Sequence, residues 1–203
     1  MNSWMRAHLF WGSHSPLSAL TGAGLLVIAS GRISGALVCT AALVWVYAFT
    51  MTAVKLGGPY LPQRGRNGIV LFLSALGSQI FMVILWIFSP VLALESSFFI
   101  LLAPVVFTVS GLAERTLAYD MPEALSQASA EALVLGTLIL ALSLIREPLG
   151  FGSLSLPGLD SIRFVREEPL RILQVSSGAL ILLGYGTAVY RYFRNRYTNS
   201  EDD

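Results

Sequence analysis

Long runs of apolar residues, separated by short polar stretches, dominate the pattern along this 203-residue chain. Six such runs cover residues 17–30, 33–54, 69–88, 98–112, 130–145 and 172–190. The second, third and sixth approach the roughly 20 residues that a helix needs to cross the hydrocarbon core of a bilayer. The fifth is shorter, and we expect it to extend back over residues 126–131. The pattern therefore predicts an all-α integral membrane protein with six transmembrane segments.

The first and fourth runs are too short for a full straight span, and both contain residues that disfavour a regular helix. Gly22 and Gly24 interrupt the first run, and Pro104 and Gly111 interrupt the fourth. Each half of the chain thus opens on a short, broken segment and continues with two longer ones, which predicts a 3+3 inverted repeat. Matched breaks favour a site between the two segments, because freed backbone groups can face a cavity but not lipid. The alternative is that the glycines only allow close helix packing.

The predicted membrane domain covers residues 15–194, between an N-terminal arm (residues 1–14) and a polar tail (residues 195–203). A signal peptide is the less favoured interpretation of the first run, since Arg6 precedes it and residues 29–31 are small. The polar tail region mixes aromatic and basic residues over residues 190–197, which is typical of a membrane interface with anionic lipid.

Basic residues predict the orientation, because cytoplasmic loops carry an excess of Lys and Arg. The loop at residues 89–97 has none, whereas the arm, the second loop and the tail carry Arg6, Lys55, Arg64, Arg66, Arg191, Arg194 and Arg196. These positions predict both termini in the cytoplasm. The last loop, residues 146–171, is an exception with four arginines, and its stretch 159–168 fits a short helix on the outer surface.

Composition narrows the class of protein further. Charged residues make up 12% of the chain, against about 25% in soluble domains. The net charge of +1 argues against nucleic acid as a partner, because no basic patch is large enough to neutralise a run of phosphates. The single cysteine, Cys39, excludes an intrachain disulfide framework, and the spacing of His8 and His14 does not place them on one helix face to bind a metal.

Charged residues near the apolar runs are the candidates for chemistry, because a charge in hydrocarbon is costly and usually functional. Glu114 and Arg115 follow the fourth run, where a role in a passage and a solvated interfacial pair are equally good interpretations. Arg146 and Glu147 end the fifth run, and we interpret them as an interfacial pair more readily than as transport residues. Glu131 is a candidate proton or cation group only if it is buried. The sequence shows no catalytic triad, phosphate loop or metal-ligand motif, so we expect a chain that is non-catalytic on its own.

Residues 141–154, ALSLIREPLGFGSL, resemble the "IRE.LG.GTL" signature of the RnfE/NqrD branch of the Rnf/Nqr membrane subunits. Residues 103–110 are similar to that family's "PLIVTNC" stretch, residues 111–114 to its "GRAE", and residues 20–26 lie where it has "LLGLCPLL". The resemblance implies a six-span subunit of the bacterial cytoplasmic membrane, in a complex that couples electron transfer to sodium or proton translocation. It also implies a homologous RnfA/NqrE-like partner and a 2Fe–2S cluster, to which each of the two subunits gives two cysteines.

The chain departs from this family pattern at the cluster ligands. Gly24 and Ser110 occupy the positions of the two cluster cysteines, and Cys39 lies in another segment. Iron–sulfur clusters need thiolate or, occasionally, imidazole ligands. We therefore expect no cofactor to be bound by this chain alone.

Three hypotheses follow from these observations. The leading one is a divergent Rnf/Nqr-type membrane subunit that forms scaffold and half of the ion or electron passage without its own cluster ligands. The second is a stand-alone secondary transporter with a site between the two broken segments, where Thr108, Ser110, Glu114 and Arg115 are candidate contacts. The third is a structural membrane partner with no passage.

Overall fold

The computed structural model describes residues 27, 29–57, 65–115, 119–155, 162–163 and 170–198. Its helices are α3 (Ile33–Gly57), α4 (Arg66–Phe88), α5 (Pro90–Ser110), α6 (Leu112–Arg115), α7 (Met121–Phe151), the 3-10 helix η3 (Arg171–Leu173) and α8 (Ser176–Thr198). Two short strands, β1 (Ser153–Leu154) and β2 (Ile162–Arg163), form an antiparallel pair after α7.

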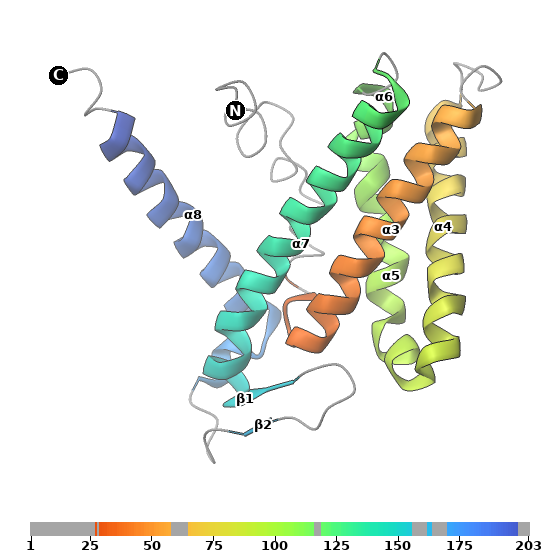
Figure 1. The fold of residues 1–203 in the computed structure, drawn as a ribbon. Coiled ribbons are helices and arrows are strands. Elements are labelled where there is room, and N and C mark those ends of the chain that lie inside the picture. The colour runs from red at the N-terminus through yellow and green to blue at the C-terminus, as the bar shows by residue number, and fades with distance from the viewer. Residues whose placement is uncertain are drawn as a thin grey trace.

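Four of these helices, α3, α4, α5 and α7, are long and apolar enough to cross a membrane. The shortest, α5, has 21 residues, which at about 1.5 Å per residue matches the bilayer core of about 30 Å. Successive helices run in opposite directions and form an antiparallel bundle (Figure 1). The prediction of an almost entirely helical chain is confirmed for the described residues, and the four helices indicate a membrane-embedded protein.

Helix α3 is the element around which the others pack. It contacts α7, α4 and α5. Half of the residues in its most apolar stretch are buried, whereas in α4 the buried share is 22%. In the core, the ring of Tyr47 on α3 meets the ring of Phe107 on α5 edge to face, with centroids 4.8 Å apart. Helix α4 lies at the outer edge of the bundle (Figure 1), as expected of a helix that faces lipid.

Small residues at intervals of four allow α7 to approach α3 closely. Ala124, Ala128, Ala132 and Gly136 are all buried on one face of α7, and α3 makes its most extensive packing with this helix. A Cβ atom at Gly136 would overlap the side chain of Thr40 on α3, whose hydroxyl lies 3.4 Å from the Gly136 carbonyl oxygen. Stripes of small residues are a common basis of helix packing in membranes, where apolar surface alone gives little driving force.

The prediction that the fourth segment is short and broken is wrong. Helix α5 runs unbroken from Pro90 through Pro104 to Ser110, and it includes residues that we assigned to a loop at 89–97. Pro90 begins the helix, where its missing N–H is not needed, and the turn from α4 consists of Ser89 alone. Pro104 removes only one internal donor, and Gly111, with φ +65°, ends the helix as a left-handed cap.

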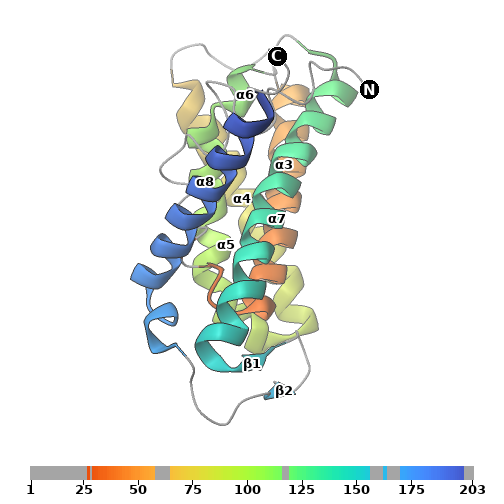
Figure 2. The same ribbon diagram turned by 90° about the vertical axis from the view of Figure 1, so that its left-hand side faces the viewer.

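The six-segment repeat stays a prediction. The first predicted segment lies largely outside the described residues. The last corresponds to α8, whose apolar part, Ser176–Gly186, is shorter than a span. This helix starts beside η3 and the end of α7 (Figure 2) and then diverges from α7 (Figure 1).

The close α3–α7 contact gives a test of the bundle. We expect Gly136→Ala to lower the melting temperature of the detergent-solubilised chain by several degrees, because the new methyl group overlaps Thr40. Thr40→Ser removes the nearest methyl group and should restore part of the loss in the double variant. The control is Gly68→Ala on α4, where nothing lies within 4 Å of the added Cβ. Equal melting temperatures for all these variants would show that the packing does not depend on Gly136.

Candidate functional site

The charged pair Arg146–Glu147 lies inside α7, which continues to Phe151, and not at its end as we predicted. A proline inside a helix removes one internal hydrogen bond and crowds the preceding turn. The helix nevertheless continues past Pro148, whose carbonyl oxygen accepts a hydrogen bond from the N–H of Gly152 (3.1 Å). Both side chains are buried, with 3% of Arg146 and 1% of Glu147 exposed. Two buried charges inside an apolar helix need compensating partners.

The guanidinium of Arg146 binds two chain segments that are distant in the sequence. Its Nη1 donates to the carbonyl oxygen of Val27 (2.8 Å) and to the hydroxyl of Ser30 (3.3 Å). Its Nε donates to the carbonyl oxygen of Leu173 (2.6 Å), and its Nη2 to that of Gln174 (2.8 Å). The planar fork of arginine suits this arrangement, since it offers several donors in fixed directions. Arg146 thus joins α7 to the turn before α3 and to η3.

The carboxylate of Glu147 caps the start of α3. Its Oε2 accepts a hydrogen bond from the backbone N–H of Ile33 at 2.7 Å. The first turn of α3 contains no acidic residue of its own, so Glu147 supplies the negative charge that a helix N-terminus favours. The cap comes from a residue 114 positions away, which ties the end of α7 to the beginning of α3.

Neighbouring residues on a helix do not face each other, so Arg146 and Glu147 serve different partners. The guanidinium meets backbone carbonyls, and the carboxylate meets a backbone N–H. Gln174 adds to the joint, because its Nε2 donates back to the carbonyl oxygen of Gly150 (2.9 Å). The arrangement holds the lower end of the bundle in Figure 1 together, where α3 begins and α7 ends. We call these two residues and their partners the α7 clamp.

The other predicted site residues do not join the clamp. Thr108 and Ser110 lie at the far end of α5, where their hydroxyls donate to the carbonyl oxygens of Pro104 (2.8 Å) and Phe107 (2.7 Å). Glu114 and Arg115 belong to the short α6 that follows. Glu131 is half-buried in the first half of α7. Because α6 and the end of α7 lie at opposite ends of the bundle (Figure 1), these residues do not form one site.

The described residues do not fit an iron–sulfur cluster. Gly24 lies outside them. Ser110 uses its hydroxyl within its own turn and also accepts a hydrogen bond from the N–H of Leu112 (3.3 Å). Cys39 is fully buried in α3, and the described part of the chain has no cluster of three His, Cys, Asp or Glu side chains. This chain would have to supply two of the four thiolates of a shared cluster, and it has one cysteine.

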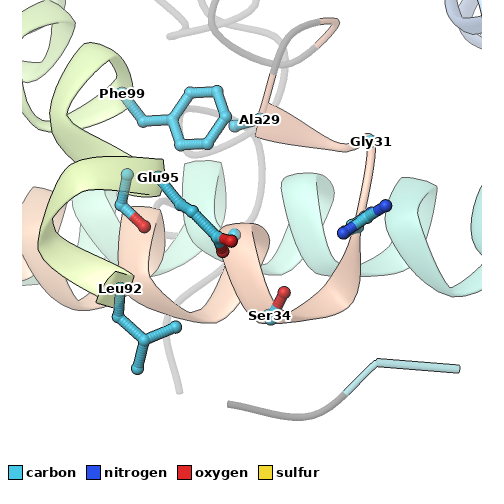
Figure 3. A pocket seen from close by; sticks show the side chains of 9 residues that line it. Ala29, Gly31, Ser34, Leu92, Glu95 and Phe99 are labelled. Atoms are coloured by element: carbon cyan, nitrogen blue, oxygen red, sulfur yellow. The ribbon is translucent and has the colours of Figure 1, made fainter. Parts of the chain in front are cut away.

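A pocket of about 330 Å³ lies beside the clamp, between residues 29–35, which include the first turn of α3, and the first half of α5. In Figure 3, Glu95 reaches from α5 toward the start of α3, where Ser34 lies, and Phe99 and Leu92 flank it. Arg32 also lines the pocket, and its guanidinium lies 5.7 Å from the centroid of the Phe151 ring. The pocket therefore contains one carboxylate, one guanidinium and an aromatic wall.

Sequence reasoning missed both Arg32 and Glu95. Arg32 lies between two apolar runs, and Glu95 lies within the loop predicted at residues 89–97. The helix tolerates these serines because a hydroxyl can bond its own helix, as Ser97 does to the carbonyl oxygen of Leu94 (2.9 Å). Pro90 could have indicated that the helix begins there, because proline is frequent in the first turn of helices.

Comparison with known proteins adds no assignment: no family model matches the sequence, and no curated protein is significantly similar to it.

The α7 clamp gives a second test. We expect Arg146→Met to cost about 3 kcal/mol of stability, because it leaves buried carbonyl oxygens without a donor. Arg146→Lys should recover only part of this, since one ammonium group cannot reach both segments. Melting of the detergent-solubilised chain measures both. Leu144→Ala, an exposed position on the same helix, is the control. A melting temperature of Arg146→Met equal to that of the control would contradict the clamp.

Proposed function

We propose that this chain is a membrane subunit of an ion-translocating electron-transport complex of the Rnf/Nqr kind, in which it forms scaffold and part of the transmembrane passage. It contributes no cluster ligands of its own. It resides in the bacterial cytoplasmic membrane with both termini in the cytoplasm, and its partners are a homologous RnfA/NqrE-like subunit and the redox subunits of the complex.

The observation that carries this proposal is the α7 clamp. Arg146 and Glu147 belong to the run that resembles the family signature, and they are the two charged side chains among the fully buried residues of the described chain. Their hydrogen bonds to the backbone of three other segments hold this end of the bundle together, which gives the residues of the signature a structural role. A residue pair with this role belongs to a scaffold.

The hydrogen bonds of Arg146 and Glu147 also argue against a role in binding and releasing a transported ion. A group that binds and releases an ion must change partners, whereas Arg146 has its donors on four oxygens and Glu147 holds a helix terminus. Breaking these bonds would leave buried polar groups unsatisfied at about 1–3 kcal/mol each. A passage in the complex is therefore better placed at a subunit interface than through the clamp.

Purification of the tagged full chain from its native membranes in a mild detergent tests the proposal. We expect flavin- and iron–sulfur-containing subunits to copurify, with absorbance from both cofactors. The chain expressed alone should contain no stoichiometric iron, because it supplies a single thiol. Glu147→Ala should reduce recovery of the complex, whereas Leu144→Ala should not. Recovery of a monomer without redox partners would contradict the proposal.

A small secondary transporter is the second candidate function, and the pocket at Glu95 favours it. The pocket lies between residues 29–35 and the first half of α5, and it carries both signs of charge. The purified chain in liposomes should then take up a small charged or zwitterionic solute. Glu95→Gln should abolish this uptake without changing the melting temperature, since Glu95 is exposed. Absence of uptake, for instance of a panel of amino acids, would rule out this candidate for those solutes.

A further inference from the structure

A carboxamide lies at the centre of the most outward-facing helix of the bundle. Gln79 is exposed, and it lies about 20 Å along α4 from Arg66 and about 14 Å from Phe88. The buried side of α4 is formed by Val70, Ser74, Gly77 and Ser78. At about 100° per residue, Gln79 lies roughly opposite the middle of that side.

This position is costly in a lipid bilayer. A polar side chain in hydrocarbon needs a hydrogen-bond partner, and the side chain of glutamine is too short to reach either membrane surface from the centre of a span. Serine and threonine can form this hydrogen bond within their own helix. The hydroxyls of Ser74, Ser78 and Thr137 donate to the carbonyl oxygens three residues earlier in the chain. Among the described residues, none forms a hydrogen bond with the side-chain carboxamide of Gln79.

The surface around Gln79 is an apolar stripe. Phe72, Leu76, Val83 and Trp86 lie within about 60° of Gln79 around the helix, and each is more than 40% exposed. A groove lined by Met82, Val83, Trp86 and Ile87 runs along the same face. The stripe therefore extends for several turns on both sides of the amide, as the contact surface for another helix requires.

We propose that this stripe binds the same stripe of a second copy of the chain, with the two Gln79 amides hydrogen-bonded across a two-fold axis normal to the membrane. An amide is both donor and acceptor, so two of them satisfy each other. Two copies inserted in the same direction also bring Gln79 to the same depth automatically, whereas a different protein needs its own polar group at that depth. The contact is isologous, as in most homodimers, and it does not depend on the proposed redox complex.

Disulfide crosslinking of the full chain in membranes tests the proposal. Val83→Cys, one turn from Gln79 and 59% exposed, should yield a crosslinked dimer on mild oxidation. Ile84→Cys lies about 140° around the helix from Gln79 and is also exposed, so it should not. The unsubstituted chain serves as the blank, because its one cysteine, Cys39, is fully buried. A dimer at position 84 equal to that at 83, or no dimer at 83, would overturn the proposal.

The role of the amide is tested in the Val83→Cys chain. Gln79→Leu should weaken association at least about three- to tenfold, the range of a single interhelical hydrogen bond in membranes, because it removes the amide from both copies. Gln79→Asn, which keeps an amide, should retain most of the dimer. Thr137→Val is the matched control, a central and exposed polar residue that bonds its own helix, and it should have no effect. An unchanged dimer in Gln79→Leu, or a Val83→Cys adduct with a different protein, would contradict pairing with a second copy.

Discussion

Burial of two opposite charges in adjacent positions of one helix is the constraint on which the rest of this structure depends. Arg146 and Glu147 cannot neutralise each other, so each must find partners on other segments. Arg146 donates to the backbone carbonyl oxygens of Val27, Leu173 and Gln174, and Glu147 accepts a hydrogen bond from the N–H of Ile33 at the start of α3. The orphan backbone groups of helix ends, which are costly in a membrane, thereby become the partners of the buried charges.

The clamp and the α3–α7 contact support each other. The stripe from Ala124 to Gly136 brings α3 and α7 close along their length, and Glu147 joins their ends. Larger residues in this stripe would push α7 away from α3, as the overlap of a Cβ at Gly136 with Thr40 indicates. Without Glu147, the N–H of Ile33 would lose its hydrogen-bond partner. Helices α4 and α5 then pack on the other side of α3, which leaves the outer face of α4 free for lipid or another protein chain.

The sequence predicted two spanning helices well, since the apolar runs 33–54 and 69–88 correspond to α3 and α4. The run 172–190 corresponds to α8, whose apolar part is shorter than a span. The sequence pattern fails where a short polar stretch inside a helix predicts a loop. Glu95, Ser96 and Ser97 lie within α5, because hydroxyls can bond their own helix and a carboxylate can face a pocket near the helix start. Pro104 and Pro148 are likewise inside helices, since tertiary packing outweighs the loss of one hydrogen bond.

The site was harder to predict than the fold, because its partners are backbone atoms. The run around Arg146 and Glu147 was recognisable as special, yet nothing in the sequence indicated that the carbonyl of Val27 or the N–H of Ile33 would meet it. Gln79 carried a clearer signal, a carboxamide at the middle of an apolar run, which periodicity alone does not highlight.

Amide hydrogen exchange at the start of α3 tests the central claim most directly, with the full chain in detergent or lipid. If Glu147 caps this helix, exchange of the Ile33 N–H should be slow in the unsubstituted chain and faster by at least tenfold in Glu147→Ala. Exchange in the middle of α4 should stay the same. Equal protection of the Ile33 N–H in both chains would contradict the clamp as the interaction that organises this end of the bundle.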